Sequence, residues 1–176
     1  MRRLIFLFSF ICVALGASSQ NMTLWYGVNY GKKTSAYDNE WKFVNFGLDY
    51  TAPIKGRFNW TAGLGYNTKG DTDRMGYVQA EGNVGYNVVH GDKFNLQVLT
   101  GPFVAVKINH DNGGWISDVG PKGDSYSYNT FSCGWQAGAV LRYSRLSLKV
   151  GYEHSFTNVY GPYKTLEWFA RVGVRL

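Results

Sequence analysis

The sequence predicts an all-β protein, a closed antiparallel up-and-down barrel of eight strands. Apolar side chains alternate with polar or small ones through eight successive segments. Aromatic residues make up 17% of the chain, glycine is abundant at 22 residues, and no long apolar stretch follows the first residues. Alternation places one parity on each face of a strand, whereas a helix requires a period of 3.6 residues. Such a composition suits strands that are apolar on one face only.

The first residues have the features of an export signal. Arg2 and Arg3 precede the apolar run 4–15, and Ala17 and Ser19 suit the −3 and −1 positions of signal-peptidase cleavage. A membrane-anchoring helix is the alternative, but a run of about a dozen residues is too short for a hydrocarbon core of ~30 Å. We therefore expect residues 1–19 to be a cleaved signal peptide and residues 20–176 to form one barrel domain.

The eight expected strands follow one another along the chain. The first four, 22–31, 44–51, 58–67 and 77–88, carry apolar residues at even positions and Gly, Asn, Thr or charged residues between them. The fifth, 94–107, is less regular, because Leu99 and Phe103 fall on the polar parity and Pro102 is expected to bend the strand or mark a bulge. The apolar parity is odd in 131–143 and even again in 146–156 and 166–176.

The connections between these strands alternate in length. Those at 53–56, 90–93 and 144–145 are short, and those at about 33–40, 68–74, 109–129 and 157–165 are longer. Outer-membrane barrels have short periplasmic turns and longer extracellular loops. The asymmetry therefore predicts one end of tight turns and one end of loops, with both termini at the turn end.

Aromatic residues of the apolar parity gather near both ends of the strands. These predicted girdles comprise Tyr30, Tyr50, Phe58, Trp60, Tyr66, Tyr86, Phe94, Phe131, Trp135, Tyr143, Tyr152, Phe156 and Trp168. Amphipathic rings of this kind belong at the two headgroup layers of a bilayer, and a sheet crosses hydrocarbon only when it is closed. The pattern predicts a transmembrane barrel. The alternative, a soluble lipocalin-like ligand-binding barrel with this parity inside, would have to fit all of these rings into a small interior.

The opposite parity carries most of the charges. They are Asp49, Glu81, Lys107, Arg142, Lys149, Glu153, Glu167, Arg171 and Arg175. The interior of an eight-stranded barrel is just wide enough to be filled by side chains. Because acidic and basic groups nearly balance, we predict a plugged polar lumen held by an ion-pair network. Glycines of the same parity, such as Gly47, Gly63 and Gly65, are expected to leave room for these long side chains.

The C-terminal segment 168–176 alternates apolar residues with Arg and Gly and ends in Leu176. With the signal, the eight strands and the turn–loop asymmetry, this segment resembles the small outer-membrane barrel family of the OmpX and OmpA-transmembrane-domain type. The resemblance implies a bacterial outer-membrane location after signal-peptide cleavage, contact with outer-membrane lipid, and recognition by the barrel-assembly machinery. The implied assembly signal is Val172, Gly173, Val174 and Leu176, although the family usually ends in Phe.

One alternative function is a lipid A-modifying, deacylase-like enzyme with a site near His154. Such an enzyme resembles a His-x-Ser pair on a late strand with a Glu further on, and here Glu153, His154 and Ser155 precede Glu167. Adjacent residues on a strand face opposite ways, so His154 and Ser155 are not expected to form the hydrogen bond that a nucleophile needs. We therefore predict no enzymatic activity and no catalytic residue.

The expected loop 109–129 contains Trp115, Tyr126 and Tyr128 and is either a surface recognition loop for an unknown partner or an ordinary loop.

The aspartates of this loop do not follow calcium-loop spacing, and the chain has no zinc spacing or phosphate loop, so neither metal nor cofactor is expected. Without a Lys/Arg cluster, the net charge of +6 does not indicate a nucleic-acid partner. These observations favour an envelope-structural or surface-contact role, with a pore as a further alternative.

Overall fold

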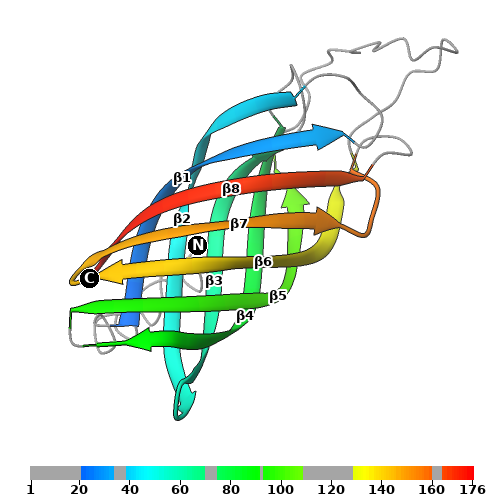
Figure 1. Ribbon diagram of the computed structural model, residues 1–176. Coiled ribbons are helices and arrows are strands. Elements are labelled where there is room, and N and C mark those ends of the chain that lie inside the picture. The colour runs from blue at the N-terminus through cyan, green and yellow to red at the C-terminus, as the bar shows by residue number, and fades with distance from the viewer. Residues whose placement is uncertain (1–20, 34–38, 70–74, 92, 109–128, 160–163) are drawn as a thin grey trace, which may run out of the picture.

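The computed structural model describes residues 21–33, 39–69, 75–91, 93–108, 129–159 and 164–176. They form eight strands: β1 (Met22–Lys33), β2 (Asn39–Lys55), β3 (Phe58–Lys69), β4 (Met75–His90), β5 (Phe94–Lys107), β6 (Phe131–Tyr143), β7 (Leu146–Ser155) and β8 (Thr165–Arg175). Each strand pairs antiparallel with the next, and β8 pairs with β1 to close the barrel (Figure 1). The predicted all-β fold and its closed eight-stranded topology are confirmed.

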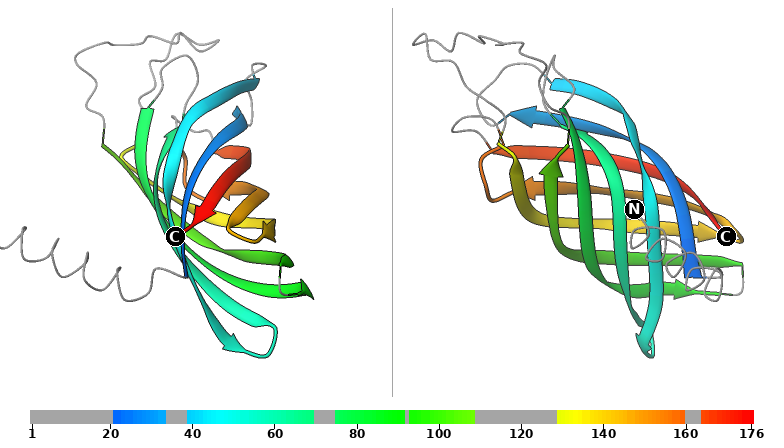
Figure 2. Two further views of the ribbon diagram at one scale, coloured as in Figure 1. Left: turned by 90° about the vertical axis from the view of Figure 1, so that its left-hand side faces the viewer. Right: turned by 180° about the vertical axis from the view of Figure 1, so that it is seen from behind.

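The strands tilt around the barrel axis, and β1 and β8 lie side by side (Figure 2). The paired ladders shift register at Gly27/Asn29, Pro53/Lys55 and Asn87/Val89. The bulge expected at Pro102 is not one of these shifts, since Pro102 pairs with Trp135 in a continuous β5–β6 ladder. A proline in a strand therefore does not by itself require a change of register.

The turn end contains two-residue turns with a left-handed residue at the first position. Gly56 has φ of 61° between β2 and β3, and Ser144 has φ of 55° between β6 and β7. Positive φ of this kind matches the twist of a tight hairpin and is unusual for a non-glycine residue. The signal peptide and most of the predicted loop 109–129 lie outside the described residues.

The strands extend further than the sequence predicted, most importantly at the loop end of β3. The expected loop 68–74 is wrong at its start, because β3 continues through Thr68 to Lys69. Alternation accordingly turns Lys69 into the barrel, where its side chain is fully buried. This extension adds to the interior a charged residue that was expected in a loop.

The distribution of polarity is inverted relative to a water-soluble protein. Among the described residues, 32 large apolar side chains are exposed and only 9 apolar side chains are buried. Leu148 and Val150, at mid-strand, are 41% and 43% exposed, whereas Arg171 and Glu153 are each 1% exposed. The apolar parity thus faces outward, opposite to the arrangement that a lipocalin-like barrel requires. The described part of the chain contains no helix with the length and apolar character to span a bilayer.

All thirteen aromatic residues of the predicted girdles lie on the outer parity and are at least partly exposed. Rings on neighbouring strands contact one another at both ends of the barrel, at Phe58–Tyr86 (5.1 Å between centroids), Tyr50–Trp60 (5.5 Å), Phe46–Tyr66 (5.5 Å) and Tyr152–Trp168 (5.8 Å). Such tilted or offset contacts add to the stability of the outer surface.

Candidate functional site

The centre of the barrel holds a cluster of four charged side chains from four strands, Asp49, Glu81, Lys149 and Arg171. Lys149 Nζ donates to Glu81 Oε1 and, at 3.3 Å, to Asp49 Oδ2. Arg171 Nη1 donates to Glu81 Oε2 at 2.9 Å. All four residues are buried, so the two carboxylates are solvated by these cationic donors rather than by bulk water. We call this group the central cluster.

The guanidinium of Arg171 lies between two aromatic rings. Its Cζ atom is 4.3 Å from the centroid of Trp25 and 4.5 Å from that of Phe169. Guanidinium groups are attracted to aromatic faces, and this attraction strengthens when both groups are desolvated. Among the described residues, Arg171 Nε and Nη2 have no hydrogen-bond partner. The guanidinium instead contacts the faces of the two rings. Trp25 also donates its indole N–H to Asp49 at 2.9 Å, which joins the rings to the charges.

Glycines make room for this cluster, but partly for a different reason than predicted. A Cβ at Gly63 would lie 2.6 Å from Asp49 Oδ1, as expected for a glycine that accommodates a charged group. A Cβ at Gly47 or Gly65 would instead lie 2.5 or 2.6 Å from Trp25 Cζ2. These two glycines therefore accommodate the indole ring, which in turn packs against Arg171.

A second cluster lies nearer the loop end and consists of Lys69, Gln79, Phe103 and Glu153. Lys69 Nζ lies 2.6 Å from Glu153 Oε1 and 4.6 Å from the ring centroid of Phe103. Gln79 Nε2 donates to Glu153 Oε2 at 3.0 Å. Both oxygens of the buried Glu153 carboxylate are thus satisfied. We call this group the loop-end cluster.

The structure divides the predicted lumen charges into three groups. Asp49, Glu81, Lys149, Glu153 and Arg171 belong to the two clusters. Glu167 is fully buried and lies directly across from Glu153 in the β7–β8 ladder, and Lys107 is half-buried at the loop end of β5. Arg142 is half-buried and Arg175 is exposed, both at the turn end, and neither joins a cluster.

Lys69 and the interior rings of Trp25, Phe103 and Phe169 were not predicted from the sequence as site residues. Lys69 continues the parity of Asn67 beyond the expected end of the strand, so a longer strand would have found it. The rings fall on the polar parity and are buried at 1–5% exposure. A ring on the lumen parity beside charged residues is the signal that could have indicated the cation–π contacts.

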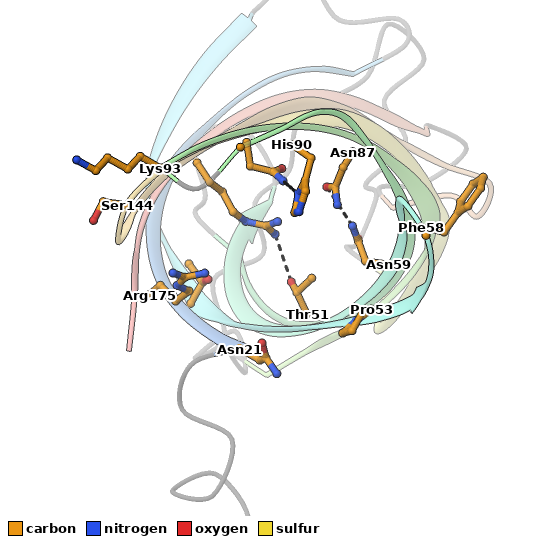
Figure 3. Close-up of a pocket in the computed structure, with 15 residues that line it drawn as sticks. Asn21, Thr51, Pro53, Phe58, Asn59, Asn87, His90, Lys93, Ser144 and Arg175 are labelled. Carbon is orange, nitrogen blue, oxygen red and sulfur yellow. Dashed lines mark hydrogen bonds between the residues drawn. The ribbon is translucent and has the colours of Figure 1, made fainter.

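At the turn end the interior widens into a cavity of about 490 Å³. Figure 3 shows its opening, with His90, Asn87 and Asn59 pointing inward and Lys93 and Phe58 pointing away. We call this cavity the turn-end vestibule. Between it and the central cluster lies a void of about 20 Å³, about the space of one water molecule. Asp49, Lys149 and Arg171 of the central cluster line this void together with Arg142, which also lines the vestibule.

His154 and Ser155 lie on opposite faces of β7, as their adjacency predicts. The ring of His154 contacts that of Phe156 on the outer surface, with centroids 6.0 Å apart. Ser155 is buried inside, where its Oγ accepts the backbone N–H of Thr165 at 2.7 Å. These two side chains do not form a nucleophile–base pair. The described residues also contain no group of three or more His, Cys, Asp or Glu side chains arranged to hold a metal ion.

No protein-family model and no curated protein matches the chain. Similar solved structures include Neisserial surface protein A, with a TM-score of 0.49 and 12% identity over 89% of this chain and 97% of that one. The attachment invasion locus protein Ail of Yersinia pestis has a TM-score of 0.49 and 12% identity over 88% and 96%. The N-terminal β-barrel domain of Pseudomonas aeruginosa OprF has a TM-score of 0.45 and 11% identity over 88% and 98%. The fold of this chain is defined by its own strand pairing, and its candidate site by its own side chains.

Proposed function

We propose that the chain is an integral protein of a bacterial outer membrane with a plugged polar lumen and a non-enzymatic role. That role is envelope-structural, or lies in surface contacts made by the loops opposite the short turns. The single observation that carries the proposal is the inverted polarity of the barrel. Its outer face exposes apolar side chains on every strand, and its buried charged side chains, which include Glu81, Glu153 and Arg171, are in the interior.

Water is a poor solvent for such a surface. Soluble monomers rarely expose contiguous apolar patches larger than a few hundred Å², yet here exposed apolar side chains occur on all eight strands. The aliphatic residues at mid-strand, such as Leu148 and Val150, suit acyl chains, and the aromatic residues near the strand ends suit headgroup layers. Closure of the sheet supports the same environment, because every strand has a hydrogen-bonding partner on both sides.

Ion pairs across the lumen support the plugged interior. Lys69 of β3 bonds Glu153 of β7, and Arg171 of β8 bonds Glu81 of β4. In each case three strands separate the two partners in either direction around the ring, so the pairs join opposite walls. These pairs, and the small volume of the void beside the central cluster, support a plugged interior.

Export and assembly complete the proposal. Residues 1–19 would direct the chain across the inner membrane and be removed. Val172 and Val174 face outward on β8 while Gly173 faces inward, and β8 forms the closing ladder with β1. A strand with this pattern at the closing ladder would be the one that the barrel-assembly machinery recognises before closure.

The test is expression of the full chain in a Gram-negative host, followed by fractionation. We expect the protein in the outer-membrane fraction, with a mass that lacks residues 1–19. An unheated sample should run faster on a denaturing gel than a boiled one, because a closed barrel stays compact in detergent until it is heated. Recovery in the soluble periplasmic extract would overturn the proposal.

A further inference from the structure

The described residues that line the turn-end vestibule carry an unbalanced charge. They include the cationic side chains Arg142 and Arg175 together with His90, and no Asp or Glu is among them. The remaining inward groups are mostly amides and hydroxyls, among them Asn59, Asn87 and Thr51. A cavity lined by cations and neutral hydrogen-bonding groups favours negatively charged ligands.

Arg142 is the more enclosed of the two arginines. Its Nη2 atom donates to Thr51 Oγ1 at 3.3 Å, a bond that crosses the opening in Figure 3. Within the described part of the chain, Arg142 and Arg175 form no ion pair. Asp49, which attracts Arg142, already accepts hydrogen bonds from Lys149 and Trp25, and the like charge of Arg175 opposes Arg142. Most of the donors of the Arg142 guanidinium are therefore left for a ligand.

The vestibule is held in shape by hydrogen bonds at its rim. Backbone bonds join Arg175 to Arg145 at 2.7 Å and Ser144 to Lys93 at 2.8 Å. On the inner wall, Asn59 Nδ2 donates to Asn87 Oδ1 at 3.2 Å. Because these contacts exist without a ligand, binding would not have to order the walls.

We propose that the turn-end vestibule binds a small multivalent oxyanion, one that carries phosphate or carboxylate groups. A guanidinium offers parallel N–H donors that match the oxygens of either group. The volume of about 490 Å³ lies in the range of roughly 300–1,000 Å³ that is usual for small-molecule sites. The same chemistry could come from a soluble anion or from the headgroup of a membrane lipid. With the plugged lumen proposed above, the vestibule would hold its ligand rather than pass it through the barrel.

The test is calorimetric titration of the barrel, folded in an uncharged detergent, with inorganic pyrophosphate. A second titration uses a short-chain phosphatidic acid below its micelle concentration. The key variant combines Arg142→Gln with Arg175→Gln. The matched control combines Lys55→Gln with Arg57→Gln, which removes two charges from exposed residues at the same end that do not line the vestibule. Heat-modifiable mobility checks that each variant folds.

We expect the wild type to bind at least one of the two probes. The control should bind the same probe with an affinity within twofold of that of the wild type. The Arg142/Arg175 variant should bind at least tenfold more weakly, and a double lysine variant should fall between them. Binding of pyrophosphate identifies a soluble anion as the ligand source, and binding of phosphatidic acid alone identifies a headgroup. Failure of the wild type to bind either probe, or an equal loss in the control, would overturn the inference. The barrel proposal would stand in both cases, because its gel-mobility and fractionation tests do not depend on the vestibule.

Discussion

Lys69 reaches across the interior of the barrel to Glu153, and their charged atoms lie 2.6 Å apart. The two residues are 84 positions apart in the chain and come from opposite walls. Arg171 and Glu81 form a second pair of this kind, at 2.9 Å. Strand pairing holds each wall together locally, and these pairs hold opposite walls at a defined separation. The buried charged side chains thus cross-link strands on opposite walls of the barrel.

Removing one partner of the loop-end pair should destabilise the barrel strongly. Lys69→Met leaves the buried Glu153 without its cation, and an uncompensated buried charge costs about 3–5 kcal/mol. The double variant Lys69→Met with Glu153→Met should recover most of that loss, because neither charge then remains buried. The measurement is urea unfolding in detergent micelles, arranged as a double-mutant cycle. Lys55→Met, at an exposed site, is the control and should change the free energy of unfolding by no more than ~0.5 kcal/mol. Equal effects of Lys69→Met and Lys55→Met would contradict the buried pair.

The indole of Trp25 makes two glycines sensitive to the smallest side chain. A Cβ at Gly65 would lie 2.6 Å from Trp25 Cζ2, so Gly65→Ala must displace a ring that also packs against Arg171. Overpacking of this kind costs about 1–3 kcal/mol. Gly82→Ala is a matched control, because a Cβ there meets nothing within 4 Å, and its effect should stay within ~0.5 kcal/mol. Thermal or urea unfolding of the two variants compares them directly, and a Gly82→Ala loss as large as that of Gly65→Ala would refute this account.

Alternation predicted the eight strands and their two faces, because period two is a property of the extended backbone that the sequence displays directly. The partners within the lumen could not be predicted in the same way. Lys69 meets Glu153 because of strand tilt and stagger, which depend on the whole closed sheet. Arg142 and Arg175 occupy lumen-facing positions of their strands, as Arg171 does. They nevertheless lie at the turn end, outside the clusters, because of where these positions fall along the tilted strands. Parity indicates the face of a strand, but depth in the barrel depends on its geometry.

The proposed plugged lumen predicts electrical silence. Reconstituted wild-type protein should give no steady conductance in planar bilayers, since side chains from opposite walls meet in both clusters and the void beside the central cluster has a volume of about 20 Å³. Replacing Glu81, Lys149 and Arg171 together by alanine removes the central cluster and should increase conductance in the variants that still fold. Steady single-channel openings of the wild type would show that the lumen is a pore.

The separation of His154 from Ser155 predicts that lipopolysaccharide remains unmodified. Incubation of the purified barrel with lipopolysaccharide, followed by mass spectrometry of lipid A, should show the same acyl chains as a protein-free control. His154→Ala should give the same spectrum as the wild type, because His154 contacts Phe156 on the outer surface and no serine of the described residues bonds to it. Loss of an acyl chain with the wild type, abolished in His154→Ala, would establish the deacylase-like alternative.

A charge on the outer face should report its depth in the bilayer. Val150 at mid-strand and Val89 near the turn end are both 43% exposed, so Val→Arg at either position would be nearly neutral in a water-soluble barrel. In a membrane, arginine costs about 2–4 kcal/mol at the midplane and about 0–1 kcal/mol near the interface. We therefore expect Val150→Arg, but not Val89→Arg, to lower the free energy of unfolding measured in phospholipid vesicles. Because the two variants share the substitution and the exposure, the difference between them depends on depth alone. If Val150→Arg is as stable as Val89→Arg in vesicles, hydrocarbon does not surround the middle of the barrel.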